Sequence, residues 1–151
     1  MITDTVNRSL DEALIPNSLK TALIIQLLKK TSLDTEGFKN FRLVSNLPFV
    51  SKLIEKSVAV QLVQYFDDNN LGEKLQSAYM KLHSTETALL RVHDDILRTV
   101  DRGCTVVLLL LDLSAAFDTF DHGILLHRVN IRFGIKGKVL AWFKSYLTDR
   151  S

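Results

Sequence analysis

A single carboxylate at the end of a strongly apolar run is the feature of this sequence that points most directly to chemistry. The run covers residues 106–111, and Asp112 follows it immediately. Because the run is continuous rather than alternating, it predicts a strand at residues 104–111 that is buried on both faces. At the end of such a strand, Asp112 is either the N-cap of a following helix or an oxygen ligand for Mg²⁺. Periodicity alone favours the cap.

Metal chemistry at this position needs more acids than Asp112. Two divalent ions about 3.5–4 Å apart can activate an attacking oxygen and stabilise a leaving one, but one carboxylate does not hold both. Asp118 and Asp121 follow soon after, and we predict that both cap turns. The sequence contains neither the Cys/His spacing of a zinc site nor a glycine-rich phosphate loop. Composition leaves a serine hydrolase triad open, although Ser114 lacks the glycines of a nucleophile elbow.

Composition bounds the class of protein. The chain has 151 residues, 46% hydrophobic and 24% charged, which suits one globular domain or a large piece of one. Its net charge of +2 neither supports nor excludes nucleic acid as a partner. The lone Cys104 excludes an internal disulfide and fits a reducing compartment, nuclear or cytoplasmic; we expect its side chain to be buried. No apolar run approaches the roughly 20 residues that span a bilayer, so no membrane partner is expected.

The hydrophobic pattern predicts the elements that must position these residues. A short helix at residues 3–14 ends before Pro16, and a strand at 23–28 pairs with 41–44 across a polar loop. A long helix runs from about 49 to 66. The second half has three further helices: one that Ser84 or Thr85 caps and Gly103 follows, one that Asp121 caps, and one at 138–147. Strands and helices mix without regular βαβ repetition, which indicates an α+β fold.

The segment LDLSAAFDTFDH at residues 111–122 closely resembles the first catalytic motif of reverse transcriptases from non-LTR (LINE-type) retrotransposons. The likeness extends along nearly the whole chain, with the motifs in the family's order. The further matching segments are NSLKTA at 17–22, LLKK at 27–30, NFRLVSNLP at 40–48, SKLIEK at 51–56, QSAY at 76–79, HSTETALL at 83–90 and WFKSYL at 142–147.

The resemblance implies a single partial reverse transcriptase domain over residues 1–151. Fingers and connecting helices would occupy about 17–100, and the start of the palm about 101–151, as in a right-hand polymerase fold truncated before its paired-aspartate hairpin. The implied activity is that of an RNA-directed DNA polymerase, working by two-metal nucleotidyl transfer with Mg²⁺. An RNA template, a DNA primer and deoxynucleotides would be its partners.

The resemblance also assigns roles to residues of the acidic motif. Asp112 would bind the catalytic metal pair, and the carbonyl of Leu113 would add a ligand. Phe117 would lie beneath the incoming sugar, where a ring collides with a 2′-hydroxyl, the group that separates RNA from DNA building blocks. Ordinary core packing is the alternative for Phe117.

Four cations receive roles in the predicted hairpin. Arg42 would contact the triphosphate, because a guanidinium makes paired contacts to phosphate oxygens. Lys29, Lys30 and Lys39 would line the template path. For each of the four, a solvated basic side chain is the alternative.

Departures from the family pattern limit what the chain is expected to do alone. The glycine-rich motif and the paired-aspartate hairpin that follow the Asp112 motif in the family do not occur in these 151 residues. Leu43 replaces a usual proline, while Ala78 and Met80 replace a usual glycine and arginine. We therefore expect the isolated chain to be inactive, and to self-associate through an open sheet edge beside the predicted strand. The alternatives are a non-catalytic nucleic-acid- or protein-binding remnant and a translated relic without a selected role.

Overall fold

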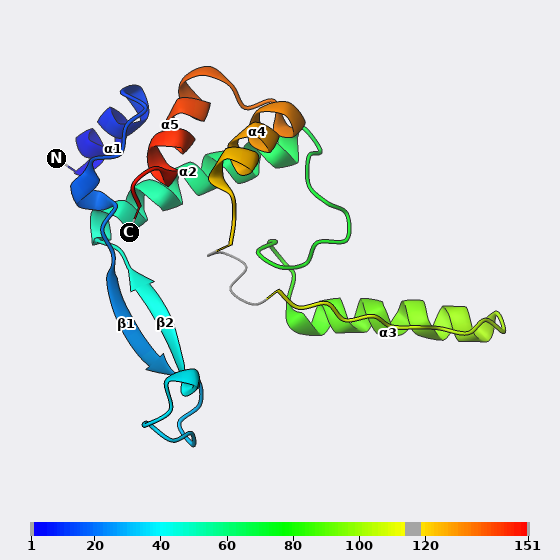
Figure 1. Ribbon diagram of the computed structural model, residues 1–151. Coiled ribbons are helices and arrows are strands. Elements are labelled where there is room, and N and C mark those ends of the chain that lie inside the picture. Colours follow the sequence, from blue (N-terminus) through cyan, green and yellow to red (C-terminus); the bar gives the residue numbers. More distant parts are fainter. Residues whose placement is uncertain (1, 114–118, 151) are drawn as a thin grey trace. The chain divides into compact units, whose positions relative to one another are not determined.

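The computed structural model describes residues 2–113 and 119–150 (Figure 1). The chain separates into two compact units, the first formed by Met1–Tyr65 with Phe120–Ser151 and the second by Phe66–Thr119. The predictions for Phe117 and Asp118 lie outside the described residues.

The first unit combines helices with a two-stranded antiparallel sheet, as expected for a mixed α and β chain. Strands β1 and β2 pair from Leu23↔Asn46 to Leu28↔Phe41, so the predicted hairpin is confirmed and its second strand is two residues longer. The elements of this unit are α1 (Ile2–Asp11), η1 (Asn17–Leu19), β1 (Leu23–Leu28), η2 (Phe38–Asn40), β2 (Phe41–Asn46), α2 (Phe49–Asp68) as far as Tyr65, α4 (His122–Phe133) and α5 (Gly137–Leu147). The predicted helices in this unit are confirmed, with small shifts of their ends.

The core of the first unit gathers around Trp142 of α5. This side chain is 4% exposed, and it clusters with Ile54 of α2, which is fully buried, and with Ile15 from the segment after α1. Val50 and Val58, four residues before and after Ile54, pack against the same cluster. Residues four apart share one face of a helix, so the apolar stripe predicted for α2 is the face that is buried.

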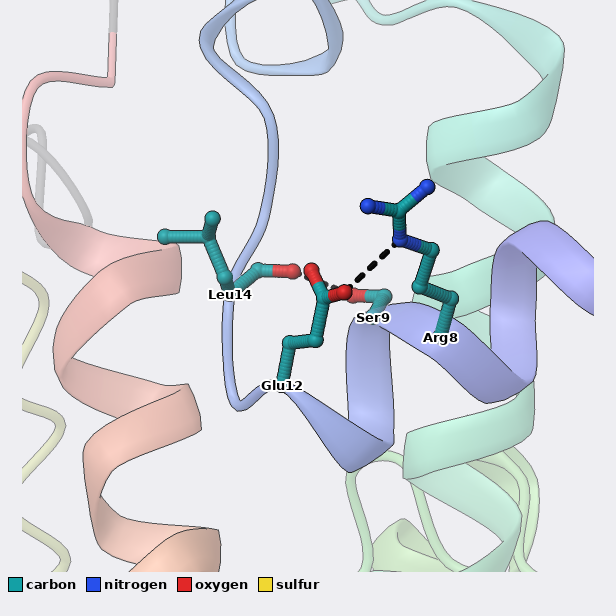
Figure 2. A network of polar contacts seen from close by, with 4 residues as sticks. All are labelled: Arg8, Ser9, Glu12 and Leu14. Carbon is teal, nitrogen blue, oxygen red and sulfur yellow. Dashed lines mark hydrogen bonds and ion pairs between the residues drawn. The ribbon is translucent and has the colours of Figure 1, made fainter.

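Hydrogen bonds fix α1 and the turn after it against α5. The indole Nε1 of Trp142 donates to Ser9 Oγ (3.2 Å). Ser9 Oγ donates in turn to the carbonyl oxygen of Leu14 (2.7 Å) (Figure 2). The backbone N–H of Ile15 donates to Ser145 Oγ (3.0 Å). Buried polar groups are costly unless they are paired, so these bonds determine which way α1 can pack.

A second group of contacts joins α5 to α2. The hydroxyl of Tyr146 and Nη2 of Arg150 both donate to Oε1 of Glu55, at 2.7 and 2.6 Å. The Arg150 guanidinium lies over the Tyr146 ring, 4.2 Å from its centroid. The Trp142 ring stacks on the same Tyr146 ring, with 5.3 Å between the two centroids. Burial, and then the hydrogen bond to Glu55, raises the pKa of Tyr146 to about 12.

The second unit contains α3 (Thr85–Asp101), which begins at a capping box. Ser84 Oγ accepts from the backbone N–H of Thr87 (3.2 Å), and Thr87 Oγ1 accepts from that of Ser84 (2.9 Å). The hydrogen bond with Ser84 lowers the pKa of Glu86 in the first turn. Gly103 has a φ of +74° just beyond the helix end, a conformation that favours glycine. The sequence-based prediction of this helix and its Ser84 cap is confirmed.

The prediction of a strand at residues 104–111 is wrong. Residues 104–113 form neither helix nor strand, and Cys104 is exposed rather than buried. Residues 107–111 are between 55% and 88% exposed. A strand exists only when a second strand satisfies its backbone groups, and β1 with β2 is the sole pairing among residues 2–113 and 119–150. Hydrophobicity alone therefore does not make this segment a strand, and no sheet edge is present at it.

Replacing Trp142 by alanine should remove the centre of the first unit. We expect Trp142→Ala to lower the free energy of unfolding by about 3–5 kcal/mol, because a large buried ring leaves a cavity. Urea denaturation of the 151-residue chain measures this loss. Val139→Ala, on the same helix at a position that is 54% exposed, should change the free energy by less than about 0.5 kcal/mol. Equal losses in the two variants would contradict the packing described here.

Tyr146 should ionise late in a spectrophotometric titration. We expect one tyrosine transition near pH 12 that is absent from the Tyr146→Phe variant, and an earlier transition in Glu55→Gln. A folded-state pKa raised above the usual 10.0 favours the neutral phenol. The contribution of the neutral Tyr146 hydroxyl to the free energy of unfolding is therefore complete below about pH 10. It is lost as the pH rises through about 12. A wild-type titration without a late transition would refute this assignment.

Candidate functional site

The predicted phosphate-contacting cations belong to one end of the β1–β2 hairpin. Arg42 is exposed on β2 opposite Leu27, and Lys29 and Lys30 follow β1 directly. Lys39 is exposed in η2, just before β2 begins. This end of the hairpin is the one away from η1 and α2 along the strands (Figure 1). The structure thus brings the four cations together through strand pairing, across a gap of up to thirteen residues in sequence.

The loop that carries Lys39 is held by its own hydrogen bonds. Lys29 Nζ donates to the carbonyl oxygen of Lys39 (2.6 Å), and the Lys29 backbone N–H donates to that of Asn40 (2.8 Å). Asn40 Nδ2 donates to the carbonyl oxygen of Asp34 (2.9 Å), whose Oδ1 accepts from the backbone N–H of Glu36 (3.0 Å). An ammonium has three donors, so Lys29 can close the loop and still contact a phosphate.

The hairpin end is not purely basic. Asp34 and Glu36 are exposed in the same loop. From residue 29 to residue 42, four cations stand against these two carboxylates. The excess is positive, which favours an anionic ligand over a cationic one.

The predicted catalytic carboxylate, Asp112, lies in the second unit. It is exposed in the segment without regular structure, and Leu113 beside it is exposed too. Because no strand forms there, the rigid strand end expected for Asp112 is absent from this structure. Asp121 caps α4: its Oδ1 accepts from the backbone N–H of Ile124 (2.9 Å), as predicted.

A carboxylate that faces solvent supplies the oxygen donor that Mg²⁺ prefers, so Asp112 fits the role of one ligand. Within residues 2–113 and 119–150, no group of three or more His, Cys, Asp or Glu side chains is arranged to hold a metal ion. Metal binding by Asp112 and Leu113 stays a prediction, as does nucleotide binding by Arg42.

Within residues 2–113 and 119–150, no helix is long and apolar enough to cross a membrane.

The first unit also holds a half-open cavity of about 390 Å³. Its walls come from α1, α2, α5 and the segment before α5, and they contain no carboxylate, histidine, serine or cysteine. The titratable groups of its lining are Tyr65, Lys136 and Lys138, which stand among mostly apolar side chains.

Sequence patterns missed Phe38, the residue before Lys39. Its side chain is 90% exposed in η2. Hydrophobic periodicity does not identify such a residue, because that method assigns apolar side chains to buried faces. Its position between a glycine and a lysine in a polar loop is the one available signal.

Comparisons with known proteins relate the chain to polymerases of mobile elements. Over 127 residues, 84% of its length, the chain is 28% identical to the Drosophila melanogaster "Probable RNA-directed DNA polymerase from transposon X-element". Over 145 residues, 96% of its length, it is 29% identical to the "RNA-directed DNA polymerase from mobile element jockey" of the same organism. The chain is similar in sequence to RNA-directed DNA polymerases. It spans 14% and 16% of the lengths of these two relatives.

The expected relationship to reverse transcriptases is confirmed at this level, and the second similarity covers the hairpin as well as the Asp112 motif. No family model and no solved structure matches the chain. The division into fingers and palm stays a prediction.

Proposed function

We propose that this chain forms part of an RNA-directed DNA polymerase, to which it contributes a template-contacting hairpin and the first acidic motif. The observation that carries the proposal is the similarity to RNA-directed DNA polymerases over 96% of the chain. The fold we propose for the intact domain is the right-hand one, with fingers from about residue 17 and palm from about residue 101.

The acidic motif would handle the reacting phosphates. When Mg²⁺ is bound, it neutralises charge on the phosphate and makes the attacking oxygen more reactive. Asp112 would hold the ion through its carboxylate and Leu113 through its carbonyl oxygen. Phe117 would exclude the 2′-hydroxyl of a ribonucleotide, and Arg42 would pair with triphosphate oxygens.

The hairpin would bind the template by charge. Lys29, Lys30 and Lys39 lie at one end of it, and cations so grouped displace counterions from a nucleic-acid backbone. This contact does not require Asp112. The same hairpin therefore supports the second candidate function, a nucleic-acid-binding protein without catalysis, and activity measurements separate the two.

Binding to a single-stranded RNA should depend on salt through the hairpin lysines. Each neutralised phosphate contributes roughly −0.7 to the slope of log K against log salt, so replacing Lys29, Lys30 and Lys39 by alanine should flatten it by about 2. The matched control replaces Lys56, Lys138 and Lys144, exposed on α2 and α5, and should leave the slope unchanged. Fluorescence anisotropy measures both. Absence of binding at low salt would contradict the proposed function.

The 151-residue chain tested by itself should not extend a primer. Its acidic motif offers Asp112 to a mechanism that needs several acids, and each lost electrostatic contact costs about 100- to 1,000-fold in rate. Incubation with an RNA template, a DNA primer, deoxynucleotides and Mg²⁺ tests this. Extension above background would overturn the expected inactivity, and its loss in Asp112→Asn would then show that the reaction requires the Asp112 carboxylate.

Self-association should follow from the exposed apolar segment at residues 107–111 rather than from a sheet edge. An exposed apolar run of this length favours pairing with a second chain. We expect sedimentation velocity to show a mass that rises with concentration, and Leu109→Lys to reduce it. The exposed Leu43→Lys in β2 serves as the control. A monomeric wild-type chain at all concentrations would argue against this route.

A further inference from the structure

Phe38 is an aromatic side chain held outward at the end of the hairpin that carries the template-binding lysines. Its side chain is 90% exposed, in contrast to the half-buried Phe41 that begins the adjoining strand. Core packing in the described structure does not account for a ring in this position.

The backbone around Phe38 is fixed on both sides. The Phe38 carbonyl oxygen accepts from the backbone N–H of Phe41, and that of Gly37 accepts from Asn40 (2.9 Å). A side chain at Gly37 would begin 2.9 Å from Nδ2 of Asn40, the donor that ties this turn to Asp34. Glycine before the ring therefore lets the loop close. Because the loop is closed, little backbone freedom remains to be lost when the ring binds a ligand.

The charges around the ring select an anionic partner. Lys39 follows Phe38 directly, Lys29 is hydrogen-bonded to the Lys39 backbone, and Lys30 and Arg42 belong to the same hairpin end. Asp34 and Glu36 offset part of this charge and leave an excess of two cations. A partner that carries negative charges at regular spacing together with flat aromatic faces matches this combination. A single strand of nucleic acid has both, and aromatic rings beside cations are how sequence-tolerant strand binding works.

We propose that Phe38 is a stacking platform for an unpaired base of a nucleic-acid strand whose phosphates contact Lys29, Lys30 and Lys39. The inference rests on the proposed function, in which that strand is the RNA template. It assigns the hairpin end a second mode of contact that is independent of charge. Stacking tolerates any base, so the contact suits a protein that copies many sequences.

Replacing the ring tests the proposal directly. Phe38→Ala should weaken binding of the full chain to a fluorescein-labelled single-stranded RNA by about 5- to 150-fold, the range for one stacked base. Phe38→Trp should restore binding and Phe38→Leu should not, because stacking requires a π system. The salt slope should stay unchanged in all three variants. Phe49→Ala, which removes another exposed ring of the first unit, should bind as the wild-type chain does.

An abasic strand separates stacking from charge. A strand of equal length whose sugars carry no bases keeps its phosphates, so wild type should bind it more weakly than the complete RNA. Phe38→Ala should bind the abasic and complete strands almost equally. Circular dichroism melting checks that Phe38→Ala is folded. We expect it to be, because the Phe38 side chain is exposed and its removal leaves no cavity.

Three outcomes would overturn the inference. If Phe38→Ala binds the RNA as tightly as wild type while the lysine variants lose binding, stacking is wrong and the template-binding hairpin stands. If Phe38→Ala weakens binding to the abasic and the complete strands equally, the ring supports the conformation of the loop and does not stack on a base. If the wild-type chain binds neither strand, the stacking proposal and the proposed function fall together.

Discussion

The packing of one tryptophan determines the architecture of the first unit. Trp142 contacts the apolar face of α2 through Ile54, while its ring nitrogen reaches α1 through Ser9. Its ring also stacks on Tyr146, whose hydroxyl binds Glu55 of α2. A buried indole needs both apolar neighbours and an acceptor. These two requirements together fix α5 against α1 and α2, and β1 and β2 are attached to the chain between α1 and α2.

Most helices and the hairpin could be predicted because their signals are local. Ser84 caps α3 with a side chain three residues from its partner, and Asp121 does the same for α4. The apolar stripe of α2 contains Ile54 with Val50 and Val58 one turn away on each side. Such patterns depend on neighbours within a few residues, so the sequence alone determines them.

The segment before Asp112 could not be predicted in this way. Its hydrophobicity matches a buried strand, but a strand also requires partners for its backbone, and that requirement is not local. The residues of the candidate site also differ in whether local sequence is enough to predict them. Lys29 and Arg42 are recognisable as cations, yet their shared position depends on strand register, and the roles of Asp112 and Phe117 come from family resemblance. Phe38 gave no periodic signal because its ring is exposed.

The bonds of Ser9 to Trp142 and of Ile15 to Ser145 connect residues 133 and 130 positions apart. On a ribosome, α1 would leave the exit tunnel long before the helix that covers it has been made. At roughly 5–20 residues per second, synthesis of the intervening residues takes about 7–26 s. During this time the apolar side of α1 has no final partner, so α1 stays accessible to chaperones that bind nascent chains.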